Sequence, residues 1–199
     1  EEVGPENVCL IMHTDPKDMH GQDLVHLLER LELTNGEVML STNKVPPEQL
    51  ALLYNLADCT LNVADAEGFG LATFESLACE TPIIVNMTGG LQEQVTDGEN
   101  WFGIGLEPAS KAIIGSQEVP YIYEDRVSGE SVVDALVKFY NMSPEERATM
   151  GRLGREHLEA HYSFKQYGER WDKILSDVHH KYGSWETRQR YQTWAFKEL

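Results

Sequence analysis

Hydrophobic and polar positions follow two different periods along the first half of the chain. Short runs that are almost entirely apolar predict strands covered on both faces, and runs with an apolar residue every three or four positions predict helices. The predicted strands cover residues 8–14, 37–42, 59–64, 82–86 and 100–106, and the predicted helices cover residues 21–33, 46–58, 70–79 and 89–95. Strands that alternate with helices over short connections indicate βαβ units. The sequence therefore predicts an α/β domain with a Rossmann-like, doubly wound parallel sheet.

The pattern weakens after residue 106. Residues 107–128 have no helical period, and within them only residues 121–125 (YIYED) resemble a strand. A long segment without regular structure is either functional or wrongly assigned. A role in specificity stays open for this excursion, but we favour surface decoration.

Helical periods return for the rest of the chain, over residues 129–142, 143–162, 163–183 and 184–199. Ser143 and Glu146 have the spacing of a capping box at the second of these helices. A stripe on the third helix is expected to face the core, and it consists of Trp171, Ile174, Leu175 and Val178. The last helix is expected to dock on a missing domain through Tyr191, Trp194 and Phe196. We expect residues 1–140 to form the Rossmann-like domain and residues 141–199 to form closing helices that pack on it.

Composition narrows the choice of partners. The chain has 199 residues and a formal net charge of −17, so its surface repels nucleic-acid phosphates and anionic lipid. We therefore expect no nucleic-acid partner, and no apolar run approaches the roughly 18 residues of a membrane span. Three scattered cysteines, Cys9, Cys59 and Cys79, are interpreted as small buried residues in a reducing compartment, which predicts a cytoplasmic protein. The chain begins with Glu1, and we expect it to be a fragment of a longer protein.

A glycine turn with an acidic residue connects the third predicted strand to the following helix. Its sequence is Glu67-Gly68-Phe69-Gly70. Ligands bind at such strand ends in open parallel sheets, and the free amides at a helix start favour an anion such as phosphate. The spacing lacks the Gly-Lys-Ser/Thr of a P-loop, and Thr73 replaces the third glycine of a dinucleotide fingerprint. Taken alone, the turn is equally consistent with a purely structural role.

A second carboxylate, Glu75, lies inside the predicted helix. Helical geometry places Leu71, Phe74, Leu77 and Ala78 on one face, with Glu75 at the border of that apolar stripe. Most helical glutamates point into water, and that is the simpler interpretation. The alternative is that Glu75 accepts hydrogen bonds from a vicinal diol such as a ribose, because its two oxygens suit two hydroxyls.

Several motifs in order resemble a known family. They are "LYNLADCTLNVADAEGFGL", "EGFGLATFESLACETPIIV" and "TGGLQEQVTDGENWFGI". Together they resemble the donor-binding, C-terminal half of retaining glycosyltransferases with the GT-B fold, namely glycosyltransferase family four, the group one transferases. The resemblance covers residues 8–103 and extends more loosely to the closing helices.

The resemblance implies roles for individual residues. Glu75 would hold the ribose hydroxyls of a nucleotide sugar, and Glu67 would contact the transferred sugar, acting through recognition and electrostatics rather than as a nucleophile. Backbone amides around Glu67-Gly68-Phe69-Gly70, the first glycine turn, would meet the diphosphate. Gly89-Gly90, the second glycine turn, would lie near the donor. The expected donor-binding residues are therefore Glu67, Gly68, Phe69, Gly70, Leu71, Glu75, Gly89 and Gly90, with Glu67 also the catalytic candidate.

The resemblance also implies the substrates. The donor would be a UDP-, GDP- or ADP-linked sugar, and the acceptor a carbohydrate, lipid or protein bound by an N-terminal domain that this chain lacks. No metal and no cofactor are expected. The family's arginine and lysine for the diphosphate come from a segment ahead of the first strand seen here, so we expect the isolated chain to be inactive.

Two alternatives stay open. A nucleotide-sugar epimerase or a phosphorylase would use the same fold with different chemistry, and a non-catalytic nucleotide-binding or assembly domain would keep only the architecture. The sequence leaves open which sugar, base and acceptor are used.

Overall fold

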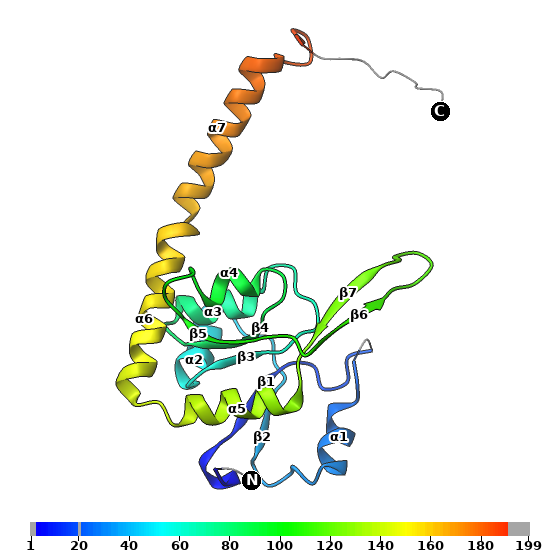
Figure 1. Ribbon diagram of the computed structural model, residues 1–199, viewed down its shortest axis with the longest axis vertical. Coiled ribbons are helices and arrows are strands. Elements are labelled where there is room, and N and C mark those ends of the chain that lie inside the picture. Colours follow the sequence, from blue (N-terminus) through cyan, green and yellow to red (C-terminus); the bar gives the residue numbers. More distant parts are fainter. Residues whose placement is uncertain (1–2, 20, 191–199) are drawn as a thin grey trace.

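The computed structural model describes residues 3–19 and 21–190. Figure 1 shows a layered α/β body from which a β-hairpin and a long C-terminal helix project. In chain order the elements are η1 (Pro5–Asn7), β1 (Leu10–His13), α1 (Leu24–Arg30), β2 (Val38–Ser41), α2 (Pro47–Leu56), β3 (Thr60–Asn62), α3 (Leu71–Ala78), β4 (Ile83–Asn86), α4 (Leu91–Val95), β5 (Gly103–Leu106), β6 (Ser110–Ile114), β7 (Ile122–Arg126), α5 (Gly129–Tyr140), α6 (Pro144–His161) and α7 (Phe164–Tyr182).

The best-packed part of the body is the parallel sheet β3–β4–β5. Its central strand β4 is buried along its whole length, as a strand covered on both faces should be. Successive side chains of a strand point to opposite faces, so Ile83 and Val85 enter one apolar cluster and Ile84 enters another.

Helices cover both faces of this sheet (Figure 1). The cluster on one face combines β4 with α3, α4 and the start of β5, and its buried members are Leu77, Ile83, Val85, Leu91, Val95 and Phe102. Leu153 and Leu158 of α6 pack against that cluster. The cluster on the other face combines Ile84 and Leu106 with Ala135 and Phe139 of α5. The helices α3, α4 and α6 therefore form one layer and α5 forms the other.

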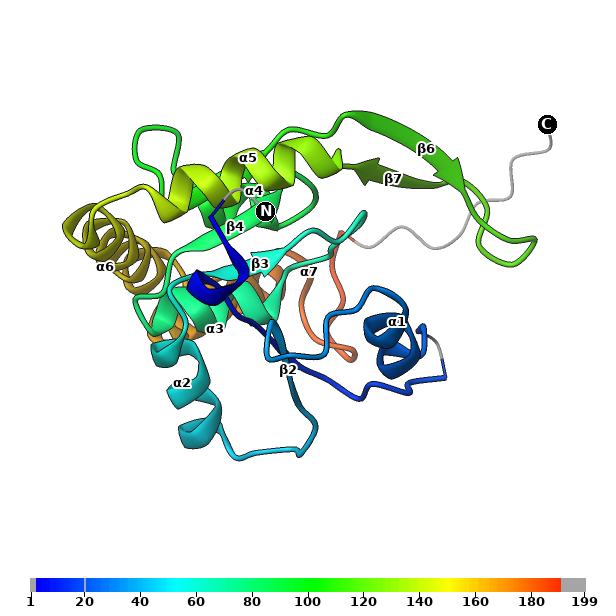
Figure 2. The same cartoon turned by 90° about the horizontal axis from the view of Figure 1, so that it is seen from below.

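The strands β1 and β2 form a separate parallel pair. Among the described strands, neither is hydrogen-bonded to β3, β4 or β5. None of the described side chains before Gly70 is buried, and Leu10 of β1 and Met39 of β2 are 47% and 58% exposed. Figure 2 shows this pair, together with α1, lying to one side of the central layers. The predicted α/β class with parallel strands is confirmed, but the hydrogen bonding divides the parallel strands into two groups.

The excursion after residue 106 is an antiparallel hairpin. β6 and β7 pair from Ser110↔Arg126 to Ile114↔Ile122. The sequence predicted a strand only where β7 lies. β6 was missed because a hairpin that projects from the body has little burial to impose an alternating pattern.

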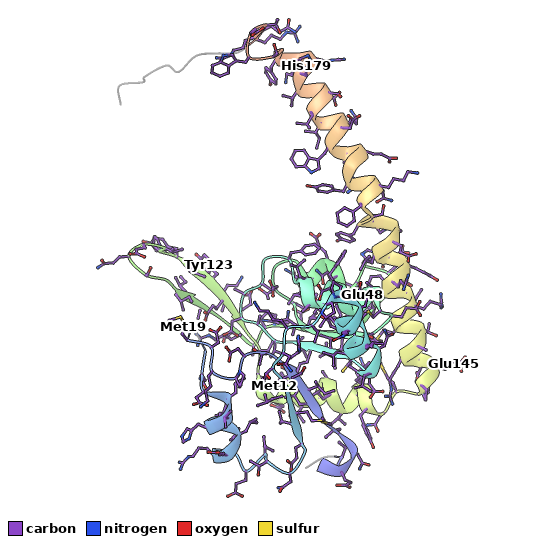
Figure 3. All side chains as sticks on the ribbon, turned by 180° about the vertical axis from the view of Figure 1, so that it is seen from behind. Met12, Met19, Glu48, Tyr123, Glu145 and His179 are labelled. Atoms are coloured by element: carbon purple, nitrogen blue, oxygen red, sulfur yellow. The ribbon has the colours of Figure 1, made fainter. Side chains whose placement is uncertain are left out.

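The C-terminal helices only partly match expectation. The capping box of Ser143 and Glu146 is present at the start of α6, and α6 packs on α3. The expected core-facing stripe of α7 is wrong within this chain, because α7 leaves the body and its stripe is exposed (Figure 3). The predicted helix over residues 184–199 is wrong for residues 184–190, which contain bends and no helix. Tyr191, Trp194 and Phe196 lie outside the described residues.

Two other expectations concern the cysteines and the membrane. All three cysteines are free, but Cys9 is exposed and Cys59 and Cys79 are half-buried, so the expectation of full burial is wrong. In residues 3–19 and 21–190, no helix combines the length and the apolar character that crossing a bilayer requires.

Candidate functional site

Two glycine turns meet at the carboxyl ends of β3 and β4. The Gly90 amide donates to the Gly68 carbonyl oxygen at 3.1 Å. A Cβ atom at Gly89 would overlap the carbonyl oxygen of Glu67, and one at Gly90 would lie 2.9 Å from that of Gly68. Only glycine permits this approach of two backbones. The structure thus brings together the two turns that the sequence singled out 20 residues apart.

Gly70 forms the start of α3. Its φ of +89° lies in the left-handed region, which side chains with a Cβ disfavour. A Cβ atom there would also lie 2.6 Å from Leu91 Cδ2, so the position is closed sterically as well. The first amides of α3 follow directly. They have no acceptor within their own helix, and with the helix dipole they favour an anion.

Gln94 of α4 fixes the first glycine turn through hydrogen bonds to its backbone. Its side chain is 1% exposed, and its Nε2 donates to the carbonyl oxygens of Phe69 at 2.6 Å and Gly70 at 3.2 Å. Its Oε1 accepts from Thr73 Oγ1 at 2.7 Å. The amide of Gln94 is therefore fully used in fixing the turn. Sequence reasoning missed it, because a glutamine in a short helix reads as a surface residue.

The buried face of α3 differs from the predicted one. Thr73, Ser76 and Leu77 are buried, whereas Leu71 is 69% exposed. The hydroxyls can be buried because they are paired: Ser76 Oγ donates to the Thr81 carbonyl oxygen at 2.9 Å. Small polar residues thus take the core positions, and Leu71 is left at the surface beside the turns.

Glu75 is exposed and is held by a tyrosine. Tyr54 Oη, from α2, donates to Glu75 Oε2 at 2.9 Å. Burial, reinforced by this bond to a carboxylate, raises the pKa of Tyr54. Tyr54 therefore stays protonated and orients the carboxylate. The sequence pattern counted Tyr54 as an apolar position of its helix, so this role was missed.

Glu67 is half-buried at the first turn. Asn62, the last residue of β3, donates from Nδ2 to Glu67 Oε2 at 3.4 Å. The contact is long, so it orients the carboxylate only weakly. Glu67 and Glu75 are in this way oriented by different elements, β3 and α2.

Aromatic rings anchor the outer side of the first turn. The Phe69 ring lies 5.2 Å from that of Phe74 on α3 and 6.1 Å from that of Tyr162, which follows α6. The Phe74 and Tyr162 rings are 5.5 Å apart and nearly perpendicular. Such edge-to-face pairs are mutually attractive. The turn is therefore attached to α3 and α6 by side chains as well as to α4 by Gln94.

The arrangement suits an anionic ligand with hydroxyl groups. Free helix amides can donate hydrogen bonds to phosphate oxygens, and the carboxylates of Glu67 and Glu75 can accept hydrogen bonds from hydroxyls. The described residues contain no cluster of three His, Cys, Asp or Glu side chains placed to hold a metal ion. A hollow of about 420 Å³ lies at the opposite end of β3 and β4, where Arg147 and Asp58 form an ion pair at 3.0 Å. No glycine turn lines that hollow.

A known protein family matches the part of the chain that contains this site. Residues 21–116 match the family model described as "Glycosyl transferases group 1". This match covers just under half of the chain, which is similar to the glycosyl transferases group 1 family over that segment. The matched segment runs from ahead of α1 to just beyond β6 and includes both glycine turns, Glu67 and Glu75. The family that the motifs resembled is therefore confirmed.

Individual relatives agree with the family. The chain is 32% identical over 111 residues to a GDP-mannose-dependent monoacylated alpha-(1-6)-phosphatidylinositol monomannoside mannosyltransferase of Corynebacterium glutamicum, a match that covers 56% of this chain and 23% of the relative. The chain thus spans about a quarter of the length of this curated relative.

Two solved structures are similar in fold. Sucrose-phosphate synthase of Thermosynechococcus elongatus superposes with a TM-score of 0.62 at 22% identity, over 86% of this chain and 39% of that chain. HepE of Anabaena, in complex with UDP and glucose, superposes with a TM-score of 0.61 at 19% identity, over 85% of this chain and 41% of that chain. These likenesses confirm the expected glycosyltransferase α/β fold. The contacts of Glu67, Glu75 and the glycine turns with a donor stay predictions.

Proposed function

We propose that this chain is the donor-binding half of an enzyme that transfers a sugar from a nucleotide sugar to an acceptor. One observation carries the proposal: two glycine turns touch at the ends of adjacent parallel strands, at the start of the helix that carries Glu75, and Glu67 lies in the first turn. Phosphate and polyol groups occur together in a nucleotide sugar. The HepE structure, which contains UDP and glucose, has the same fold.

The proposed roles follow from this geometry. The diphosphate lies against the amides at Phe69, Gly70 and Leu71, close to the turn of Gly89 and Gly90. Glu75, oriented by Tyr54, accepts the ribose hydroxyls, and Glu67 accepts hydroxyls of the transferred sugar. Gly68 gives the ligand room, because a Cβ there would meet nothing within 4 Å.

The proposed chemistry relies on the leaving group. The bond between the sugar's anomeric carbon and the diphosphate oxygen breaks, a bond to an acceptor hydroxyl oxygen forms, and the proton of that hydroxyl passes to the departing diphosphate. Helix-start amides stabilise the negative charge that develops on the departing nucleoside diphosphate. The negative charge of Glu67 stabilises an oxocarbenium-like transition state. We propose a retaining transfer that requires neither a metal nor a cofactor.

The rest of the protein's activity is also a proposal. The acceptor, a carbohydrate, lipid or protein, would bind to a domain outside this chain, and the isolated chain would then be inactive in transfer. We keep the division into a nucleotide-sugar-binding domain over residues 1–140 and a C-terminal segment over residues 141–199, of which α6 packs on that domain. We also keep a cytoplasmic location, which the three free cysteines favour.

A calorimetric titration with UDP, GDP and ADP tests the proposal. We expect one of the three to bind, and we expect Glu75→Gln to weaken that binding about tenfold or more, the effect of losing a hydrogen bond from a hydroxyl to a charged acceptor. Glu169→Gln is the matched control, because Glu169 is an exposed glutamate of α7, outside the layered body. It should bind as the wild type does. A chain that binds none of the three nucleotides, or a Glu75→Gln variant with unchanged affinity, would contradict the proposal.

A further inference from the structure

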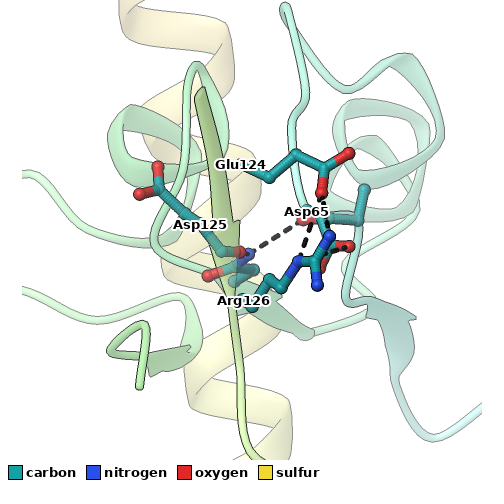
Figure 4. A network of polar contacts seen from close by, with 6 residues as sticks. Asp65, Glu124, Asp125 and Arg126 are labelled. Atoms are coloured by element: carbon teal, nitrogen blue, oxygen red, sulfur yellow. Dashed lines mark hydrogen bonds and ion pairs between the residues drawn. The ribbon is translucent and has the colours of Figure 1, made fainter. Parts of the chain in front are cut away.

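Asp125 of β7 lies where three separate segments of the chain meet (Figure 4). Its amide donates to the carbonyl oxygen of Asp65, in the loop after β3, at 2.7 Å. Its Oδ2 accepts from Thr88 Oγ1, in the loop after β4, at 2.9 Å. Its Oδ1 pairs with Lys111 Nζ of β6 at 3.1 Å. One residue of the hairpin thus contacts both loops that carry the glycine turns.

The contacts between the hairpin base and the loops after β3 and β4 form a junction. A buried side-chain amide strengthens this junction. Asn86 is fully buried, and its Nδ2 donates to the carbonyl oxygens of both Ala64 and Asp125. If the hairpin base moved away, this buried donor would lose one of its two acceptors. Leaving a buried polar group without a partner is unfavourable. The hairpin base is therefore held to the ends of β3 and β4 from the inside.

The ion pairs around Asp125 stabilise this junction less than the buried Asn86 amide does. Arg126 Nη2 lies 2.7 Å from Glu124 Oε2, and Arg126 Nε lies 4.0 Å from Asp65 Oδ2. The Arg126 side chain is about half exposed, and exposed ion pairs stabilise little. Asp125 differs because its carboxylate is 18% exposed and has two partners. Hydrogen bonds from Thr88 and Lys111 hold its pKa below the usual value, so it is ionised at neutral pH.

The junction lies next to the proposed donor site. Asp65 precedes Glu67 by two residues, and Thr88 directly precedes Gly89. Few other contacts fix the carboxylate of Glu67, whose bond from Asn62 is long at 3.4 Å. We propose that Asp125 is a positioning residue, which holds the Glu67 loop and the Gly89 turn at the spacing that a nucleotide sugar requires. The hairpin then shapes the site, in place of the surface decoration that the sequence favoured.

This inference rests on the proposed function, but part of its test does not. Amide hydrogen exchange of the chain without ligand measures the positioning directly. In Asp125→Ala we expect residues 88–90, next to the lost bond from Thr88, to exchange about tenfold or more faster, while β4 keeps its wild-type protection. Residues 63–68 should change less, because the bond to Asp65 comes from the backbone amide of residue 125, which alanine keeps. Asp125→Asn keeps an oxygen that can accept from Thr88 and should restore most of the protection.

Matched variants separate positioning from general damage. Glu118→Ala, at the exposed hairpin turn, removes a carboxylate from the same hairpin without touching the junction and should leave exchange unchanged. Thr88→Val removes only the donor to Asp125 and should reproduce the faster exchange, which keeps the test valid if Asp125→Ala does not fold. Unchanged exchange of residues 88–90 in Asp125→Ala or Thr88→Val would overturn the inference.

Binding of UDP-glucose and GDP-mannose, used as probes, connects the junction to the ligand. We expect the sugar nucleotide that the wild type binds to bind about tenfold more weakly to Asp125→Ala, with recovery in Asp125→Asn, because a loosened loop must be ordered on binding. Equal affinity of wild type and Asp125→Ala would overturn the inference. A wild type that binds neither probe would count against the proposed function, and the exchange experiment would still decide whether Asp125 positions the loops.

Discussion

The two groups of parallel strands are built from similar sequence but are packed very differently. Ile84 of β4 is fully buried on the face that α5 covers, whereas Leu10 of β1 is 47% exposed and no residue of β1, α1 or β2 is buried. Both groups have short apolar strands followed by amphipathic helices. The difference shows that an apolar strand is stabilised only when layers cover both of its faces and its edges are paired. In this chain the candidate site belongs to the covered group, where α3, α4 and α6 hold it.

The sharpest test of this contrast is a pair of identical substitutions in the two strand groups. Ile84→Ala in β4 should lower the free energy of unfolding by about 3–5 kcal/mol, because it removes a fully buried side chain and leaves a cavity. Ile11→Ala in β1 should lower it by about 1 kcal/mol, because Ile11 is only half-buried. Urea unfolding of both variants measures the two values, and equal losses would break the comparison.

A second pair compares glycines in the two regions. Gly89 and Gly36 both have positive φ, but a Cβ at Gly89 would overlap the backbone of Glu67 and one at Gly36 would meet nothing within 4 Å. Gly89→Ala should therefore destabilise by about 2–4 kcal/mol, from backbone strain plus displacement of the neighbouring turn. Gly36→Ala should destabilise by about 1 kcal/mol, from φ alone.

Denaturation midpoints of the two glycine variants measure this difference, and a nucleotide titration adds a second measurement. Gly36→Ala should keep nucleotide binding and Gly89→Ala should lose it. A Gly36→Ala variant as unstable as Gly89→Ala would show that the β1–β2 region is packed more tightly than its exposure indicates.

The smallest expected effect concerns pH. His157 of α6 stacks on Phe102 at 4.7 Å, and burial, together with the nearby His161, lowers its pKa. A lowered folded-state pKa means that the unfolded chain takes up the proton first as the pH falls through about 6.5. Stability should therefore decrease as the pH falls from about 7.5 to about 5.5, and the loss should level off below the folded pKa.

Urea midpoints at both pH values measure this effect. His157→Gln should reduce the difference between them. His26→Gln, at an exposed position of α1, should leave the difference as in the wild type. An unchanged pH dependence in His157→Gln would assign the effect to other groups.

Much of the fold follows from periodicity alone, since each predicted βα unit of the first half contains the observed strand and helix. The strand β4, predicted over residues 82–86, is Ile83–Asn86 in the structure. The failures occur where burial does not follow the local pattern. The apolar stripe of α7 shows that the helix is amphipathic, but not what covers it, and β6 pairs only with β7 away from the core.

The candidate site was predictable to the extent that it is local in sequence. The glycine turns, Glu67 and Glu75 lie within motifs whose residues are close along the chain. Tyr54, Gln94 and Asp125 were missed, because each reaches the site from another element and looks ordinary in its own. A tyrosine on an apolar helix face, a glutamine in a short helix and an aspartate in an exposed hairpin acquire a role only when packing places them beside the turns.

The central claim is that the two touching glycine turns form a nucleotide site in the well-packed group. The most direct measurement is a titration of the isotopically labelled chain with UDP, GDP and ADP, followed by the NMR shifts of its backbone amides. We predict that one nucleotide shifts the amides of residues 68–72 and 88–91 and leaves those of β1 and β2 in place. Shifts confined to β1 and β2, or no shifts with any of the three nucleotides, would contradict the account.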